Sequence, residues 1–197
     1  MEPLVQDGYV SADETWQLAD LLRFGLYAHA TAMELARDEH VLLQQVPSAN
    51  KPSTLSGSVA CKDGSERPFD LHYVLKLMRT DSALRDEMDR GWCISSLISL
   101  GDRLAAGGYF DRAPVLEMVR HLRNGVAHGN RFTIRNPDEL RSWPAHTRDA
   151  ACRGDAVFEI TEALDGSPVL FDFMGVGDVL DLLISVGTHL KRLDAAP

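Results

Sequence analysis

The sequence predicts an all-α fold, an antiparallel helical bundle with a small β-hairpin inserted before the last helix. Apolar residues recur at helical spacing over most of the chain, and the spacing changes to two only near residues 157–173. Glycine and proline stand at the ends of these periodic stretches. The 197 residues are enough to bury roughly 70% of the surface exposed in the unfolded chain. We therefore expect residues 1–197 to form a single domain that needs no disulfide or metal.

The first predicted element is a long N-terminal helix over residues 15–43. Leu22, Leu26 and Met33 recur on one of its faces. Acidic residues stand at its start, where the positive end of a helix dipole favours them. Residues 44–68 are rich in proline, serine and glycine and have no apolar period. This stretch is therefore predicted to be a long loop.

The core of the bundle is expected over residues 69–193. The pair Ala113-Pro114 begins one of its helices, because proline is favoured in the first turn. Gly129 follows that helix where a glycine commonly ends one. Residues 137–154 are polar and predicted to be irregular. The helices of the core are predicted, in chain order, at residues 69–78, 82–105, 113–128 and 176–193.

The predicted hairpin precedes the last of these helices. Residues 157–160 and 169–173 alternate apolar and polar side chains, as half-buried strands do. They flank Asp165-Gly166, a pair typical of turns. The two stretches are therefore predicted to pair with each other.

The charge of the chain is unevenly distributed. The formal net charge is −9, yet residues 112–153 carry eight arginines against four acidic residues, a net charge of +4. Arginine binds phosphate oxygens through two parallel hydrogen bonds, so this basic segment is a candidate phosphate-binding site. The alternative is a solvated surface patch that pairs with the acidic ends of the chain.

Several classes of site and location are disfavoured. None of the seven histidines stands at a spacing typical of metal ligands, so we expect no metal. A glycine pattern at Gly175 and Gly177 has Leu180 where a dinucleotide-binding loop needs its third glycine, so we expect no cofactor. No apolar run reaches membrane-spanning length, and the N-terminal residues do not resemble a signal peptide. Three widely spaced cysteines form no disulfide pattern, and a cytoplasmic protein with no membrane contact is expected.

One short motif lies inside the basic segment. Arg123 and Asn124 are followed after three residues by His128, and the motif ends an amphipathic helix. It resembles the motif of the HEPN family (higher eukaryotes and prokaryotes nucleotide-binding), in which a polar residue follows the arginine. The hairpin and the final Gly-Asp-Val-Leu-Asp-Leu-Leu helix look like a bacterial subgroup of that family. The resemblance implies a homodimeric, metal-independent endoribonuclease of a toxin–antitoxin or phage-defence type, or else a non-catalytic dimeric module that binds nucleotides or proteins.

The chemistry of RNA cleavage explains why these residue types would be needed. Cleavage without metal requires a base for the 2′-hydroxyl, an acid for the leaving oxygen and a cation for the charge that develops on phosphate. Histidine can act as base or acid near neutral pH, and arginine stays charged. One histidine cannot do both at once, so two copies are expected to pair across a two-fold axis. The expected partners are therefore a second copy, RNA and a regulatory protein.

The expected roles follow from this scheme. Arg123, His128 and Asn124 are the candidate catalytic residues, and Arg120 and Arg131 are candidate RNA- or phosphate-binding residues. On a regular helix the side chains of Arg123 and His128 would point about 140° apart. Arg123 must then reach around the helix, or the helix must loosen close to His128.

Overall fold

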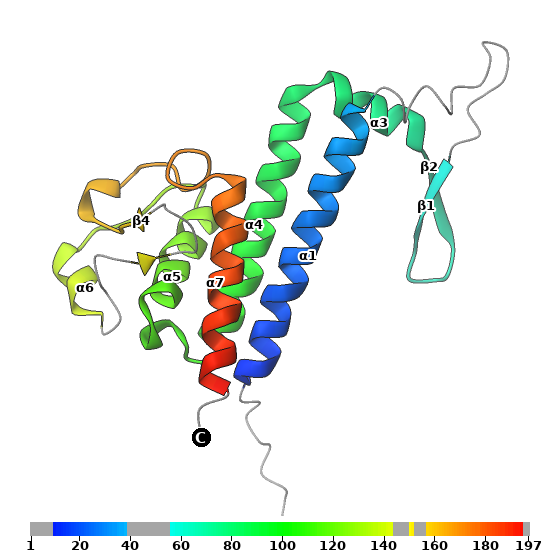
Figure 1. Ribbon diagram of the computed structural model, residues 1–197. Coiled ribbons are helices and arrows are strands. Elements are labelled where there is room, and N and C mark those ends of the chain that lie inside the picture. Colours follow the sequence, from blue (N-terminus) through cyan, green and yellow to red (C-terminus); the bar gives the residue numbers. More distant parts are fainter. Residues whose placement is uncertain (1–9, 39–55, 144–149, 152–156, 195–197) are drawn as a thin grey trace, which may run out of the picture. The chain divides into compact units, whose positions relative to one another are not determined.

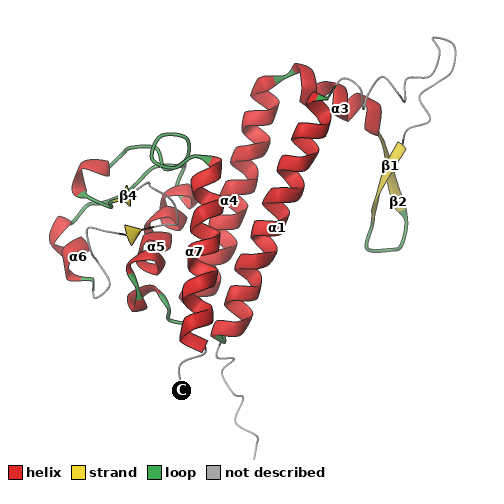
Figure 2. Cartoon of the chain, in the orientation of Figure 1, coloured by secondary structure: helices red, strands yellow, loops and turns green. Residues whose placement is uncertain are grey.

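The computed structural model describes residues 10–38, 56–143, 150–151 and 157–194 (Figure 1). These residues are mostly helical, with a small two-stranded antiparallel sheet before the last helix, which confirms the predicted fold class (Figure 2). The chain divides into two compact units, one of residues 1–26 with 90–197 and one of residues 27–89. Its assignment to a single HEPN-like domain stays a prediction.

The larger unit is built around one hydrophobic core. This unit contains the first part of helix α1 (Ala12–Arg37) and most of helix α4 (Ser82–Ala106). Helix α7 (Val176–Asp194) lies beside them (Figure 1). Helices α1 and α4 approach closely at Gly25 because this residue has no side chain. A Cβ added there would lie 2.9 Å from a ring atom of Trp92 in α4. Leucines supply most of the large, fully buried side chains, namely Leu97, Leu100, Leu104, Leu116, Leu122, Leu170, Leu182, Leu183 and Leu190.

Helix α5 (Pro114–Ala127) lies in the centre of this unit and contacts α7. It begins with proline in its first turn, as predicted. The stretch predicted to be irregular contains helix α6 (Pro137–Ser142) and strand β3 (Ala150–Ala151). Helix α6 forms because Asn136 caps it: the Asn136 Oδ1 accepts hydrogen bonds from the backbone N–H groups of Asp138 and Glu139 at 3.2 and 3.3 Å.

The small sheet before α7 pairs differently from the prediction. Strand β4 (Val157–Phe158) pairs with β3, not with residues 169–173. The Val169 N–H instead bonds to the Asn130 carbonyl at 3.0 Å, and a short 3₁₀ helix, η2 (Glu162–Leu164), precedes the Asp165-Gly166 turn. The chain folds back at Phe171, which has a φ of 72° and cannot continue a strand. The alternating pattern therefore located strand β4 correctly, but the predicted second strand at residues 169–173 is wrong, because these residues form turns with an isolated bridge at Leu170.

The smaller unit contains a second hairpin where the sequence predicted a loop. Strands β1 (Ser56–Ala60) and β2 (Glu66–Asp70) are antiparallel, and Gly64 has a φ of 81° in their connection. The Phe69 ring covers Gly57, where an added Cβ would lie 2.4 Å from Cζ. The loop prediction is thus wrong for these strands because their polar, nearly exposed sequence lacks a two-residue apolar period. Residues 44–55 lie outside the described residues.

Two helical features complete the smaller unit. Helix α3 (Leu71–Thr80) follows β2 directly and is capped by Asp70, whose Oδ1 accepts the Tyr73 N–H at 3.0 Å. Its Met78 packs with Met33 and Ala36 of α1. Helix α1 ends at Arg37, earlier than the predicted residue 43, and residues 39–43 lie outside the described part.

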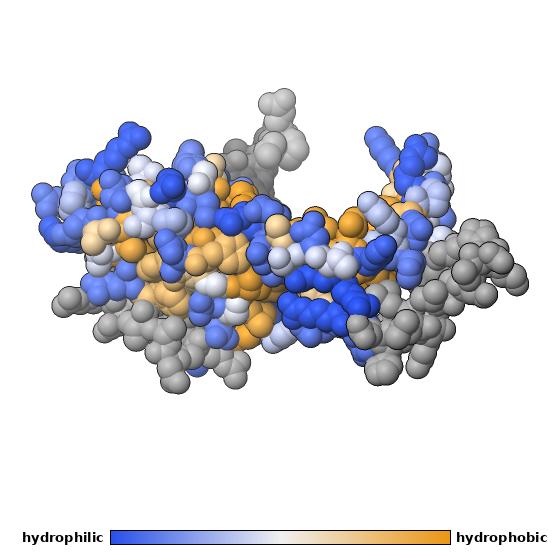
Figure 3. Space-filling view, turned by 90° about the horizontal axis from the view of Figure 1, so that it is seen from above, coloured by the Kyte–Doolittle hydropathy of each residue, from blue (hydrophilic) through white to orange (hydrophobic). Residues whose placement is uncertain are grey.

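One buried polar contact lies in the smaller unit. His29, 7% exposed, contacts the Asp89 carboxylate with its Nε2 at 2.7 Å within the smaller unit. No helix in the described part of the chain combines the length and apolar content needed to span a membrane. The face seen in Figure 3 shows hydrophobic groups interspersed among hydrophilic ones.

The first prediction concerns His189 of α7. Burial lowers the pKa of His189 below its usual 6.5, and Arg192 lowers it further; its Nε2 has no hydrogen-bond partner among the described residues. The His189 imidazole therefore binds a proton more readily in the unfolded chain than in the folded one. As the pH falls from about 7.5 to about 5.5, protonation of His189 in the unfolded chain lowers the free energy of unfolding. Chemical denaturation at both pH values should show a smaller fall for His189→Phe. Equal falls in the two proteins would contradict this assignment.

Candidate functional site

The site predicted from sequence lies at the C-terminal end of α5. Most of this helix is buried, so its position in the larger unit is fixed by packing. The buried residues are Val115, Leu116, Glu117, Met118, Val119, Leu122, Gly125 and Val126. The exposed positions near its end are Asn124, Ala127 and His128. These positions form the surface on which a second molecule could meet the helix.

The helix ends at His128 through a defined turn. The His128 backbone has φ −112° and ψ 43°, and its N–H bonds to the carbonyls of Asn124 and Gly125 at 3.1 and 3.2 Å. Gly129 follows with a φ of 84°, and the Arg131 N–H returns to the Gly125 carbonyl at 3.0 Å. This confirms the predicted glycine stop. The His128 imidazole is exposed and makes no hydrogen bond or ion pair with the described residues.

Arg123 lies on a different side of α5 and is held by α4. Its Nε and Nη2 both donate to Asp102 Oδ1, at 2.8 and 2.6 Å. Its aliphatic stem covers Gly101, where an added Cβ would lie 2.5 Å from the Arg123 Cγ. Its Nη1 donates to Asn124 Oδ1 at 3.3 Å, so these two motif residues are in contact.

The Arg123–Asp102 pair is accessible to solvent. The side chains of Arg123 and Asp102 are 34% and 54% exposed. An ion pair at this exposure is worth little free energy, because water and salt screen it. A phosphate group could therefore displace the Asp102 carboxylate from the guanidinium.

The two candidate RNA-binding arginines are partly occupied by contacts within the unit. Arg120 is 12% exposed, donates to Asp111 at 2.6 Å and stacks over the Trp143 ring at 3.4 Å from its centroid. Arg131 is exposed, and its Nη1 donates to the Gly166 carbonyl at 2.6 Å. Both residues therefore stabilise the fold, whatever else they bind.

A pocket that the sequence did not indicate opens beside this site. It has a volume of about 290 Å³ and lies between α5, residues 133–136 and α6. Its polar lining includes Arg120, His121, Asn124, Arg135, Asn136 and Glu139. Arg120 and Asn124 thus come together at the pocket, whereas Arg123 and His128 do not line it. The Asn136-Pro137 pair, a helix-start signal, could have revealed α6 and hence one wall of the pocket.

Neither a metal-binding cluster nor a similarity to known proteins assigns a function to this site. In the described ranges, no group of three or more histidine, cysteine, aspartate or glutamate side chains is arranged to hold a metal ion. Comparisons with protein-family models, with curated proteins and with solved structures found no match to this chain.

The second prediction tests how Arg123 is positioned. In Gly101→Ala the new methyl group meets the Arg123 Cβ and Cγ at 2.7 and 2.5 Å, so helix α4 or the arginine must move. We expect the free energy of unfolding to fall by about 1–3 kcal/mol, as overpacking does. Gly91→Ala, on the same helix, is the matched control, since apart from its own helix backbone no described part of the chain lies within 4 Å of the added Cβ. It should be neutral or stabilising by up to about 1 kcal/mol. Equal denaturation midpoints for both variants would contradict the prediction.

Proposed function

We propose that this chain is a HEPN-like, metal-independent endoribonuclease that acts as a homodimer. The observation that carries the proposal is the exposed imidazole of His128, which has no partner among the described residues, at the end of the helix that also presents Arg123. A proton-transfer group must reach its substrate, and a phosphate-binding cation must be able to exchange its partner. The exposure of His128 and of the Arg123–Asp102 ion pair supports both roles.

The proposed reaction is a transesterification within the RNA. The imidazole of one His128 takes the proton of the 2′-hydroxyl, and the 2′-oxygen forms a bond to the adjacent phosphorus. The bond from phosphorus to the 5′-oxygen breaks, and the His128 of the second copy gives that oxygen a proton. The products are a 2′,3′-cyclic phosphate and a 5′-hydroxyl. Arg123 stabilises the charge on the phosphate oxygens, and Asn124 positions Arg123 through its Oδ1.

A specific observation favours a second function. Two hydrogen bonds join Arg123 to Asp102, which is what a structural role for the arginine would require. In that case the chain is a non-catalytic dimeric HEPN module that binds a nucleotide or a protein. The two functions differ in whether purified protein cleaves RNA.

The cellular setting is part of the same proposal. The three cysteines are widely spaced in the sequence and form no disulfide pattern, so we place the protein in the reducing cytoplasm. A ribonuclease there would damage its own cell if it were always active. The family resemblance implies a toxin or phage-defence role, and a regulatory protein partner would hold such an enzyme inactive.

The test is incubation of the purified protein with mixed RNA and with DNA of the same sequence, in the presence of EDTA. We expect RNA to be cut to fragments with 2′,3′-cyclic phosphate ends and DNA to resist, because DNA lacks the nucleophilic 2′-hydroxyl. Absence of RNA cleavage by well-folded protein would favour the binding module. Cleavage that EDTA abolishes would contradict a metal-independent mechanism.

The third prediction concerns the oligomeric state. Because α5 is mostly buried, the interface must use its exposed end near Asn124, Ala127 and His128. Light scattering at micromolar concentration and moderate salt should give twice the chain mass of 21.8 kDa. Ala127→Arg should shift the mass toward the monomer, since it places like charges opposite each other across the two-fold axis. A monomeric wild-type protein would contradict the dimeric mechanism.

A further inference from the structure

We propose that the pocket between α5 and α6 binds a phosphate group of the RNA strand beside the cleavage site. The RNA ligand rests on the proposed function, whereas the pocket's affinity for phosphate rests on its own lining. The pocket shares Asn124 with the candidate catalytic motif, so a strand bound there would pass the end of α5. Its volume of about 290 Å³ suits one phosphate with its sugar, since typical sites for larger ligands start at about 300 Å³.

Two arginines of the lining carry hydrogen-bond donors that have no partner among the described residues. Arg135 is exposed and makes no hydrogen bond or ion pair with the described residues. The Nη1 atom of Arg120 is buried and has no hydrogen-bond partner in the described part of the chain, while its Nη2 is held by Asp111. Arginine donors in such an arrangement favour a phosphate, whose oxygens accept several hydrogen bonds at once.

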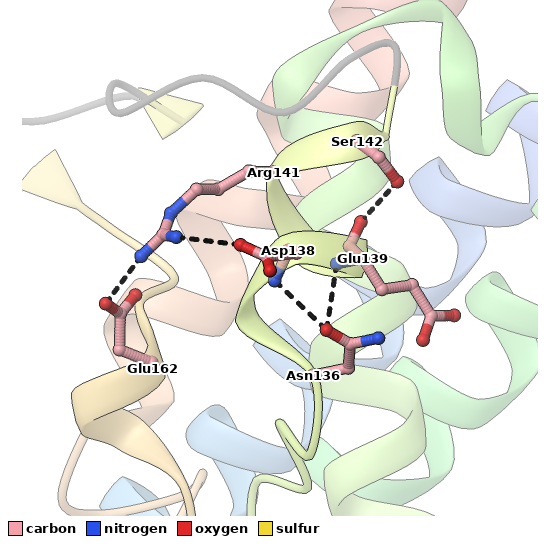
Figure 4. A network of polar contacts seen from close by, with 6 residues as sticks. All are labelled: Asn136, Asp138, Glu139, Arg141, Ser142 and Glu162. Carbon is pink, nitrogen blue, oxygen red and sulfur yellow. Dashed lines mark hydrogen bonds and ion pairs between the residues drawn. The ribbon is translucent and has the colours of Figure 1, made fainter.

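Asn136 adds a donor whose direction is set by the helix cap. Its Oδ1 accepts the two N–H groups at the start of α6, so its Nδ2 is turned away from the helix backbone (Figure 4). An amide fixed in this way loses little freedom when a ligand binds. The cap therefore both forms the wall of the pocket and orients a donor in it.

Helix α6 carries one charged residue inside the pocket lining and one outside it, which allows a controlled test. Glu139 is a carboxylate in the same lining and should repel phosphate. Arg141, on the same short helix, does not line the pocket; it binds Asp138 at 3.3 Å and Glu162 at 2.7 Å (Figure 4). Arg135→Gln and Arg141→Gln therefore remove the same charge from nearby positions, of which only one can touch the ligand.

The experiment is a fluorescence anisotropy titration of the full-length protein with a short 2′-O-methyl RNA, which lacks the nucleophile and cannot be cleaved. We expect Arg135→Gln to weaken binding roughly tenfold or more, the effect of one charge-assisted hydrogen bond. Asn136→Ser, which keeps an oxygen for the cap, should weaken binding by a smaller factor. Arg141→Gln should change it less than twofold, and Glu139→Gln should tighten it.

The outcomes separate this inference from the proposed function. Equal weakening by Arg135→Gln and Arg141→Gln would overturn it, because binding would then follow surface charge alone. If the wild-type protein cleaves RNA but none of the pocket variants changes the affinity for RNA, the proposed role of the pocket is overturned and the proposed ribonuclease activity stands. Binding that depends on Arg135 in a protein that cuts no RNA would support the pocket and overturn the catalytic proposal. Adenosine 5′-monophosphate that competes in wild type but not in Arg135→Gln would support a site for one nucleotide.

Discussion

His128→Ala should lose RNA cleavage by roughly 10²–10⁴-fold, the usual contribution of a proton-transfer group. In the proposed dimer the substitution removes both the base and the acid, since each copy supplies one. The expected loss therefore lies near the upper end of this range. Single-turnover cleavage of a labelled RNA, with excess protein at neutral pH, measures the chemical step without product release.

The fold should survive this substitution. The His128 side chain is exposed, and the turn that ends α5 is made by backbone N–H groups and Gly129 rather than by the imidazole. An exposed histidine at the end of a helix contributes only about 0.3–1 kcal/mol through the helix dipole. His72→Ala, in the smaller unit, controls for loss of a histidine outside the site. Unchanged cleavage by well-folded His128→Ala protein would show that the site has been assigned incorrectly.

The helices of the larger unit could be predicted because their periodic apolar faces meet one core. Pro114 and Gly129 bound α5 in the sequence, and the same residues bound it in the structure. Strand pairing was harder to predict, since short extended stretches can pair with any exposed backbone edge. The Val169 N–H thus bonds to the Asn130 carbonyl beside an isolated bridge between Arg131 and Pro168, and the mostly exposed β1–β2 hairpin has no apolar pattern from which it could be recognised.

The candidate site shows the same division between local and long-range information. The end of α5 at His128 is a local property, and Gly129 allowed it to be predicted. The contact of Arg123 with Asp102 joins residues that are 21 positions apart and depends on the absence of a side chain at Gly101. The pocket depends on α6, which an asparagine cap and a proline establish within a polar stretch. These contacts follow from the packing of helices and could not be read from the motif.

Arg123→Gln should lower the rate of RNA cleavage by roughly 10²–10³-fold, as the loss of one preorganised charge-stabilising group does. The glutamine keeps the stem that covers Gly101 but removes the charge that binds the phosphate oxygens. The loss should appear mainly in kcat, because this interaction is strongest when charge develops in the transition state. Arg123→Lys should recover part of the rate, since it restores the charge without the forked geometry.

Asp102→Asn provides the matched comparison for Arg123→Gln, because it disrupts the same ion pair from the other side. If the Asp102 carboxylate only holds Arg123 until phosphate displaces it, the variant should keep its kcat and bind RNA at least as tightly as wild type. If the pair is structural, both variants should instead lose stability together and leave any cleavage rate per folded molecule unchanged. Thermal unfolding and single-turnover rates measured on the same samples distinguish these outcomes. A loss of kcat confined to Arg123→Gln would assign the arginine to phosphate binding in the transition state, because both variants break the pair but only one removes the cation.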